Sequence, residues 1–344
     1  MTTRVGLLLT GDSVLTVVLV KGTLLVLALL LIRLLVGRRS AATRSALWTV
    51  AAAGLLMLPV LQYLLPVRPL SLLAFPTFLF QHDADSFGWA TSLPLAVWMA
   101  IVWCAGVVLL LGRFIRHLIA VRRLALDSDP MPRTTLRRAL TEGDGRTCGS
   151  VRVRYSRSVT SPVTFGWWRP TILLPFEART WPPEWLASAL SHELAHVRRR
   201  DYLVLVLTEV LRAVYWPNPL IWRVTNMVRA ELEHACDDAV LRGGVNRTEY
   251  ARHLLELASC QRMAPTVGAL PMVRRSFFRA RVRAILDDRA DRTPASRHLL
   301  VAAGLIWIFV VGGLGGAGLW SCGGQTAPPA ATSTSHPGSR LAAG

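Results

Sequence analysis

Two histidines and a glutamate give the sequence its clearest chemical signal. In the stretch SHELAH at 191–196, His192 and His196 are four residues apart, so a helix would place them one turn apart on the same face. Two imidazoles so placed can bind one zinc ion, and Glu193 can act as general base toward a water molecule on the metal. The alternative is a surface helix that carries two unrelated histidines.

An acidic cluster at residues 231–238 offers the third protein ligand that a catalytic zinc site needs. The chain has a formal charge of +18 and only 21 acidic residues, yet four of these lie within the eight positions of the cluster. On a helix Glu233 and Asp237 would share a face. Glu233 could then complete the metal shell, while Asp237 accepts a hydrogen bond from a ligand histidine and fixes its tautomer. A solvated acidic helix is the alternative.

The segments around both motifs predict the elements that would position them. The segment after the proline pair 182–183 reads as a helix, because prolines suit a first turn and apolar residues recur along it at helical spacing. Two strands are predicted before it, at 151–155, where residue types alternate, and at 171–174. Prolines bound the second strand at both ends, which favours an edge position in the sheet.

Several ordered motifs, taken together, resemble the integral-membrane metallopeptidases of the BlaR/MecR antirepressor type. They are SPVTFG at 161–166, RPTILLP at 169–175, HELAH at 192–196 with RRDY at 199–202, WPNPLIW at 216–222, and EHACD at 233–237. The resemblance covers most of the chain. It implies His192, His196 and Glu233 as ligands of one zinc ion (Zn2+) per chain, Glu193 as the catalytic base, and Asp237 beside them.

The resemblance also bears on the choice of third ligand and on substrate binding. Glu231, two residues before Glu233, is the competing ligand, although it would lie on a different face of the helix. The spacing from Glu233 to Asp237 is also similar to that of the more distant membrane zinc proteases of the CAAX-processing type. In zinc proteases of this architecture an edge strand holds an extended substrate, and the resemblance gives that role to residues 171–174, with an ordinary sheet edge as the alternative.

The composition points to a membrane protein. The hydrophobic fraction is 52%, which is high for a soluble chain. Apolar runs predict four transmembrane helices, at about 14–36, 46–65, 93–111 and 298–320. The +18 charge is concentrated at the ends of these runs without a nucleic-acid-binding motif, so it indicates inner-side basic loops and no direct nucleic-acid binding.

The basic loops agree on one orientation. They place the N-terminus outside and residues 113–297 in the cytoplasm. The fold class expected is therefore a mainly α integral membrane protein: residues 1–112 form a three-helix membrane domain, and an α+β zincin-like (gluzincin) domain at 113–297 is inserted before the fourth helix. The tail at 321–344 is expected to be disordered and outside.

Several further features have two interpretations each. Lys21 within the first apolar run is either functional or snorkels to the interface. The apolar helix at 203–214 either belongs to the core or lies against the membrane. The basic stretch at 273–283 reads as a helix on the inner leaflet, or as a self-cleavage segment by the resemblance. Glycines late in the fourth run suggest close helix packing, and Cys236 is either a packed thiol or a neighbour of the metal.

The function expected from the resemblance is a cytoplasm-facing zinc endopeptidase in signal transduction. It would cleave a small winged-helix DNA-binding repressor, or itself, and the chain could form a homodimer in the lipid bilayer. A quality-control protease and a non-catalytic signalling scaffold are the alternatives. BlaR/MecR proteins carry a penicillin-binding sensor after the last span. Residues 321–344 contain no Ser-x-x-Lys motif, so β-lactam acylation is not the expected input.

Overall fold

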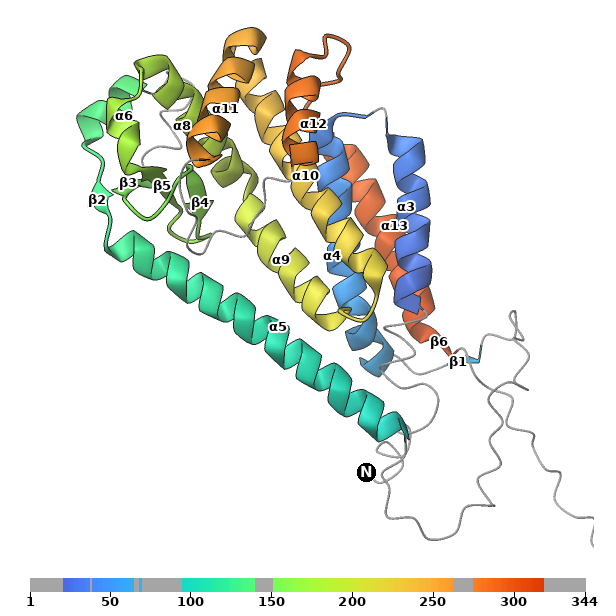
Figure 1. The fold of residues 1–344 in the computed structure, drawn as a ribbon. Helices are drawn as coiled ribbons and strands as arrows, with labels where there is room; N and C mark the ends of the chain where they lie inside the picture. The colour runs from blue at the N-terminus through green and yellow to red at the C-terminus, as the bar shows by residue number, and fades with distance from the viewer. Residues whose placement is uncertain are drawn as a thin grey trace, which may run out of the picture.

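The computed structural model describes residues 21–37, 39–64, 68–69, 95–139, 151–262 and 275–318. Within these ranges the chain is mainly helical, with a small sheet at one end of the helical bundle (Figure 1). The helices are α3 (Gly22–Val36), α4 (Ala41–Leu64), α5 (Leu95–Leu126), α6 (Arg133–Ala139), α8 (Pro183–Arg199), α9 (Asp201–Val214), α10 (Pro219–Arg242), α11 (Arg247–Arg262), α12 (Arg275–Leu286) and α13 (Arg297–Gly316), with the 3-10 helix η4 (Phe176–Thr180). The strands are β1 (Arg68–Pro69), β2 (Asp129–Pro130), β3 (Arg152–Ser156), β4 (Val163–Phe165), β5 (Thr171–Pro175) and β6 (Ala317–Gly318).

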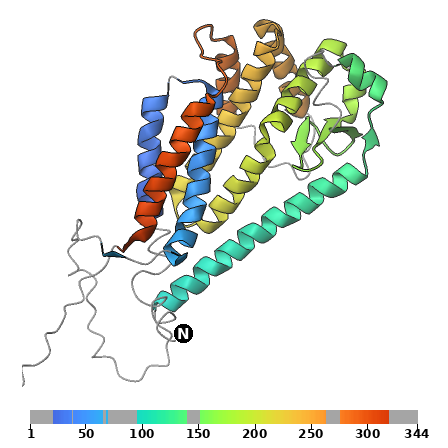
Figure 2. The same ribbon diagram turned by 180° about the vertical axis from the view of Figure 1, so that it is seen from behind.

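Two of the described helices are long and apolar enough to cross a membrane. They are α4, over Ala41–Leu61, and α5, over Val97–Leu126. The first and fourth predicted spans correspond to α3 and α13, whose apolar parts are shorter. Helix α5 continues about ten residues or more beyond the predicted end at 111, past Arg113 to Leu126, and lies along α9 toward the sheet (Figure 2). The four-span topology and its orientation remain predictions.

The helical hairpin α9–α10 packs into the same core as the predicted membrane helices. Leu211 of α9 and Val228 of α10 are buried in one hydrophobic cluster with Leu55 of α4 and Val26 of α3. The Tyr215 hydroxyl, between the two hairpin helices, donates a hydrogen bond to the Leu55 carbonyl oxygen at 2.7 Å. Of the two interpretations of residues 203–214, the structure supports a core helix.

The sheet corrects the prediction of an edge strand at 171–174. Its strand order is β2-β3-β5-β4, so β5 lies between two neighbours, parallel to β3 and antiparallel to β4. Every residue of β5 is buried, and Ile172 and Leu174 pack with Leu190 and Leu194 of α8. The flanking prolines lie at the two ends of β5, so they remove few of the hydrogen bonds between β5 and its neighbours. Among the described strands, the free edge next to α8 belongs to β4.

Close packing of α13 rests on a glycine of another helix. Gly54 of α4 lies against the indole of Trp307, and a Cβ atom at position 54 would overlap that ring. Gly304 and Gly312 of α13 have open space where a Cβ atom would stand. Trp307 is itself buried in the main core. A large ring on α13 therefore fits against a small residue on α4, and the predicted packing role of the glycines after Gly312 stays a prediction.

Helix α12 shows how the basic stretch at 273–283 packs, while its predicted position on the inner leaflet stays a prediction. It packs on α10 and α11, and Ile285 is buried with Val240 and Tyr250 in a small cluster. Arg279 and Arg283 are exposed, but Arg281 is turned inward. The self-cleavage interpretation stays a prediction. The segment between the second and third predicted spans, apart from residues 68–69, and the tail at 321–344 lie outside the described residues.

Candidate metal centre

The helix α8 carries His192 and His196 toward the interior of the molecule. Its first residue is a proline, whose fixed φ suits that position. Arg200 ends it in a left-handed conformation, with φ 57°, and its backbone N–H bonds to the carbonyl oxygens of His196 and Val197. The two imidazole rings lie edge to face, with 4.9 Å between their centroids. As the spacing predicted, the rings are neighbours on one helix face.

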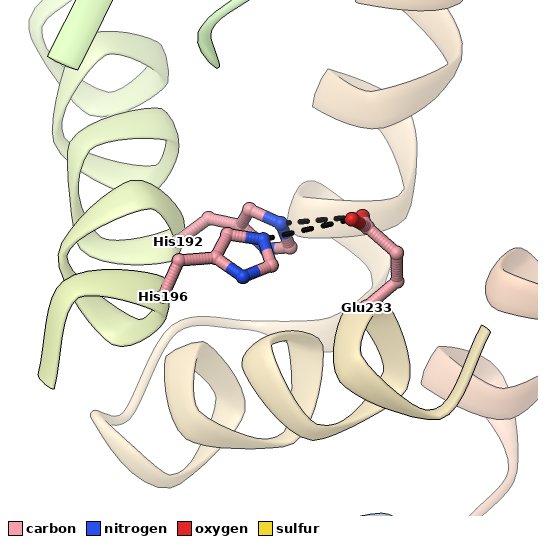
Figure 3. A group of neighbouring side chains, drawn as sticks. All are labelled: His192, His196 and Glu233. Atoms are coloured by element: carbon pink, nitrogen blue, oxygen red, sulfur yellow. Dashed lines mark ion pairs between the residues drawn. The ribbon is translucent and has the colours of Figure 1, made fainter. Parts of the chain in front are cut away.

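The helix α10 brings Glu233 to the two histidines. Asn218 caps the start of this helix by accepting a hydrogen bond from the Leu220 N–H at 3.0 Å. One Glu233 carboxylate oxygen is 3.5 Å from Nε2 of His192, and the other is 3.6 Å from Nε2 of His196 (Figure 3). The ligand atoms of these residues all lie within 4.8 Å of one another. Two imidazole nitrogens and a carboxylate oxygen form a donor set that zinc prefers.

Glu231, the competing third ligand, makes other contacts. Its carboxylate accepts a hydrogen bond from Nε of Arg44 at 2.9 Å and lies 3.8 Å from the Arg33 guanidinium. The Glu231 side chain is 5% exposed, so these arginines of α4 and α3 compensate a buried charge. Glu231 therefore ties α10 to the predicted membrane helices, and Glu233 is the glutamate that faces the histidines.

Each histidine has a carboxylate on the ring nitrogen that faces away from Glu233. Nδ1 of His192 is 3.2 Å from Asp237, and Nδ1 of His196 is 2.9 Å from Asp201. A carboxylate at Nδ1 holds the proton there and leaves Nε2 free for a metal. Asp237 was predicted for this position. The role of Asp201 was not, although the residue belongs to the RRDY motif that supported the family resemblance.

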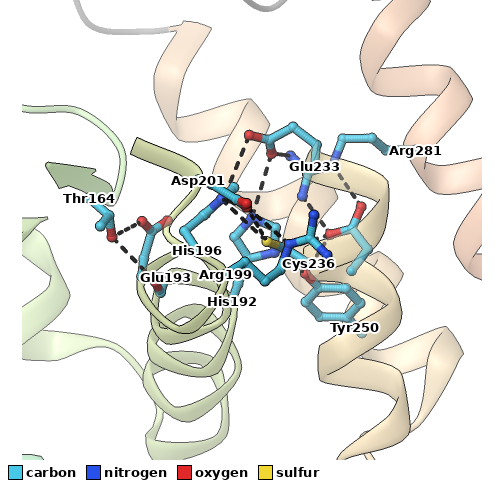
Figure 4. A network of polar contacts seen from close by, with 11 residues as sticks. Thr164, His192, Glu193, His196, Arg199, Asp201, Glu233, Cys236, Tyr250 and Arg281 are labelled. Atoms are coloured by element: carbon cyan, nitrogen blue, oxygen red, sulfur yellow. Dashed lines mark hydrogen bonds and ion pairs between the residues drawn. The ribbon is translucent and has the colours of Figure 1, made fainter. Parts of the chain in front are cut away.

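Tyr250 of α11 joins the same arrangement (Figure 4). Its hydroxyl donates to Asp237 at 2.8 Å and lies 3.0 Å from Nδ1 of His192. Burial, together with the charge of Asp237, raises the pKa of Tyr250 well above its ordinary value. The phenol is therefore a hydrogen-bond donor that helps to hold the Asp237 carboxylate in place.

Arg281 is the residue that sequence reasoning missed. Its guanidinium lies 2.8 Å from Glu233, and donates to both carboxylate oxygens of Asp237 at 2.9 and 2.6 Å. Burial alone would raise the pKa values of Glu233 and Asp237, but Arg281 and His192 lower them well below their ordinary range. The spacing of α12 contained a weak signal, because Arg281 precedes the buried Ile285 by four residues and shares its face.

The electrostatic balance also acts on His192. Burial lowers its pKa, but hydrogen bonds with Asp237 and Glu233 outweigh that effect and raise the pKa to about 10. The imidazole therefore binds a proton strongly. A metal ion that binds at Nε2 has to displace the proton from that nitrogen.

Glu193 faces the opposite side of the histidine pair, toward the sheet. The hydroxyl of Thr164 in β4 donates a hydrogen bond to its carboxylate at 2.7 Å (Figure 4). Glu193 is 7% exposed. The SPVTFG motif thus supplies a partner that orients the glutamate expected to be the base, and this partner lies on the free edge strand.

Cys236 is a buried thiol beside His196. Its sulfur is 3.3 Å from Nδ1 of His196 and 3.4 Å from Asp201. Burial, with the nearby Asp201 charge, raises the pKa of Cys236 well above its usual range, so the residue is a neutral packed thiol. His234 instead lies beside the Phe277 ring of α12, at 6.3 Å between centroids.

Comparison with known proteins matches this arrangement to a family of membrane peptidases. Residues 13–285 match the family described as BlaR1 peptidase M56. The chain is 40% identical over 93 residues to the regulatory protein BlaR1 of Bacillus licheniformis. The aligned segment covers 26% of this chain and 16% of that protein. The chain is 28% identical over 111 residues to the methicillin resistance mecR1 protein of Staphylococcus aureus, covering 32% and 19% respectively.

The matched portion spans less than a fifth of the length of either relative. The family match is much broader, since it covers most of the chain and includes both helices that carry the histidines and Glu233. On this ground the chain belongs to the BlaR1 peptidase M56 family, a family of metallopeptidases.

Proposed function

We propose that this protein is a zinc-dependent membrane endopeptidase that acts on the cytoplasmic side and signals by cleaving a transcriptional repressor, itself, or both. The observation that carries the proposal is the convergence of two imidazole nitrogens and one carboxylate, each histidine with its own carboxylate at Nδ1. Family membership supports peptide-bond hydrolysis, and the names of the relatives support a regulatory role.

The donor set fits zinc, with His192, His196 and Glu233 as the ligands. A zinc ion at these ligands would supply the Lewis acid for hydrolysis of a peptide bond. Glu193, which Thr164 holds in position, would accept a proton from the attacking water. Asp237 and Asp201 keep the proton of each imidazole on Nδ1. Arg281 balances the negative charge of Glu233 and Asp237.

The substrate peptide lies, in this proposal, along the free edge of β4. This strand pairs with β5 through Val163–Phe165, and among the described strands its other side has no partner. An extended peptide can add to such an edge through backbone hydrogen bonds. The side chain of Thr164 already connects this strand to Glu193, so an added peptide would pass close to the base. The role expected of residues 171–174 therefore passes to β4.

The test is zinc content together with cleavage, measured on full-length protein purified in detergent. We expect about one zinc per wild-type chain, loss of the metal in Glu233→Ala, and its retention in Glu231→Ala. Glu193→Gln should keep the metal and lose cleavage. A wild-type chain without zinc would overturn the proposal in favour of a non-catalytic scaffold. Metal loss in Glu231→Ala alone would move the third ligand by two residues.

A second measurement addresses the signalling part of the proposal. Cells that express wild-type protein or Glu193→Gln are compared by quantitative proteomics of truncated peptides. A DNA-binding repressor, or this chain itself, should be cut only with the wild type. Cleavage confined to many unrelated, damaged membrane proteins would instead indicate a quality-control protease.

A further inference from the structure

A cavity opens beside His196, between the turn that joins β4 to β5 and the junction of α8 with α9. Its volume is about 250 Å³, and it is lined by Thr164, by residues within 166–170, and by residues within 196–202. By the same measure one water molecule needs only about 10–15 Å³, so the cavity has room for an amino-acid side chain. It begins where the free edge of β4 ends, beside the metal centre.

Aromatic rings form one wall of this cavity and are exposed to solvent. Trp167 is 59% exposed and Trp168 is 84% exposed, while Tyr202 lies 6.4 Å from the Trp167 ring. Gly166 makes the turn possible, since its φ is +84° and a Cβ atom would come within 3.1 Å of the Arg169 carbonyl oxygen. The turn is thus built to project two indoles into water, which is unfavourable unless something covers them.

Arg200 lines the cavity from the other side, and its backbone has a left-handed conformation that is unfavourable for arginine. Among the described residues it is the one non-glycine residue with positive φ, which costs about 1–2 kcal/mol for an ordinary side chain. Its backbone is fixed on both sides by hydrogen bonds with Val197 and Leu203, each at 3.0 Å. Glycine would satisfy this helix end at lower cost, so the turn alone does not explain an arginine.

The charge of the cavity is positive. Arg198 and Arg200 line it, and among the described residues no carboxylate does. The two acidic side chains nearest in sequence are engaged elsewhere, Glu193 with Thr164 and Asp201 with His196 and Arg199. Across the described ranges the Arg200 guanidinium forms no hydrogen bond or ion pair. A guanidinium and aromatic rings that line the same cavity can receive an acidic side chain, whose carboxylate pairs with the guanidinium while its methylene groups pack on the rings.

We propose that this cavity is a substrate subsite that receives an acidic side chain, aspartate or glutamate, close to the scissile bond. The substrate carboxylate pairs with Arg200, and its methylene groups lie against Trp167. The inference rests on the proposed peptidase function, since it names which peptides the site selects. It also accounts for the exposed indoles and for an arginine in a left-handed conformation.

Cleavage specificity tests the proposal. Zinc-loaded, full-length protein digests a proteome-derived peptide library, and mass spectrometry gives the residue frequencies around each cut. We expect aspartate and glutamate to be enriched about tenfold at one position near the cut, as a charge-assisted hydrogen bond implies. Arg200→Glu should change the preference at that position to lysine and arginine. Arg169→Glu is the matched control, because Arg169 is an exposed arginine of the β4–β5 turn that does not line the cavity.

Binding gives a readout that does not need catalysis. Fluorescein-labelled hexaglutamate and its hexaglutamine counterpart are titrated into the zinc-loaded protein. The acidic peptide should bind about tenfold more tightly, and Arg200→Glu should abolish that difference while Arg169→Glu keeps it. Loss of the difference in both variants would show general attraction to a basic protein and overturn the proposal, as would cleavage with no acidic preference. No cleavage, with Arg200-dependent binding intact, would overturn the peptidase function and leave the acid-binding cavity.

A membrane contact is the competing explanation of the exposed indoles. In nanodiscs that contain brominated phospholipids, quenching of tryptophan fluorescence is compared between wild type and a Trp167→Phe, Trp168→Phe variant. We expect equal or stronger fractional quenching in the variant, because it lacks two indoles that the lipid does not quench. Clearly weaker quenching in the variant would place these indoles in the lipid and overturn the subsite.

Discussion

Two carboxylates orient the two histidines of the candidate centre, and each comes from a different place in the fold. Asp237 reaches His192 from the helix that carries Glu233, whereas Asp201 reaches His196 from the start of the next helix, α9. Arg199 donates to Asp201 at 3.2 Å and to the Ser45 hydroxyl at 2.7 Å. The second carboxylate is thereby tied to the first turns of α4, so the orientation of His196 depends on a predicted membrane helix.

Both carboxylates should therefore control zinc affinity. Asp201→Asn and Asp237→Asn keep the size of the side chain but remove the charge that holds the Nδ1 proton, and we expect each to weaken zinc binding about 10–100-fold. Competition with a zinc-binding dye measures the affinity. Asp129→Asn is the control, since Asp129 is exposed and paired with Arg179. Wild-type affinity in both site variants would contradict the assigned role.

Arg281 should matter for stability as well as for the site. Its side chain is 13% exposed and compensates the buried Asp237 and the partly exposed Glu233, so Arg281→Met removes the positive charge that both carboxylates share and should lower the free energy of unfolding by about 3–5 kcal/mol. Arg281→Lys keeps the charge and should cost less. Chemical denaturation in detergent measures the change, with Arg279→Met, exposed on the same helix, expected within about 0.5 kcal/mol of wild type. An equal effect of Arg279→Met would contradict the prediction.

The sequence predicts the parts of the centre that depend on local contacts within one helix. The pairs His192 with His196 and Glu233 with Asp237 are each one helical turn apart, so spacing alone placed them on common faces. Arg281 and Tyr250 come from α12 and α11, which the packing of α10 brings to the site. Helical spacing gave a weak signal that Arg281 faces inward, because it lies four residues before Ile285, but no spacing within one helix shows which other helix that face contacts.

At the scale of elements, strand existence was predictable and strand order was not. The stretches at 151–155 and 171–174 form β3 and β5, as their residue types predicted. Prolines at both ends of β5 indicated an edge, yet a proline disturbs only the hydrogen bond that its missing N–H would have made. Because β5 ends at Pro175, it accepts neighbours on both sides. The short β4, which the sequence did not predict, is the strand beside Glu193.

The contact between α4 and α13 yields a prediction with a control on the facing helix. Gly54→Ala puts a methyl group into the Trp307 ring, and overpacking of this kind should cost about 1–3 kcal/mol. Gly304→Ala has open space and should be neutral or slightly stabilising, since alanine favours helix more than glycine. Thermal unfolding of the two variants measures the change in stability caused by each substitution. Equal destabilisation by both would contradict the prediction, since Gly304→Ala places its methyl group in open space.

At the scale of the whole molecule, the candidate centre lies where two hydrophobic cores meet. Helix α8 belongs to the core under the sheet, through Leu190 and Leu194, and α10 belongs to the core of the predicted membrane helices, through Val228 and Leu232. His192 and His196 are on the first helix and Glu233 is on the second. A metal ion held by all three would connect the two cores, and a displacement of α10 against α8 would separate the ligands.

Zinc should accordingly stabilise the junction between the cores more than either core. At a free zinc concentration of about 100 times the dissociation constant, linkage predicts a gain of about 2.7 kcal/mol. Hydrogen exchange should slow in α8 and α10 and stay unchanged in α13, which packs on α4 away from the ligands. Glu193→Gln should keep the whole gain, because the base is not a ligand, and Glu233→Ala should lose it. Equal protection of the Glu233→Ala protein would mean that zinc acts somewhere other than between α8 and α10.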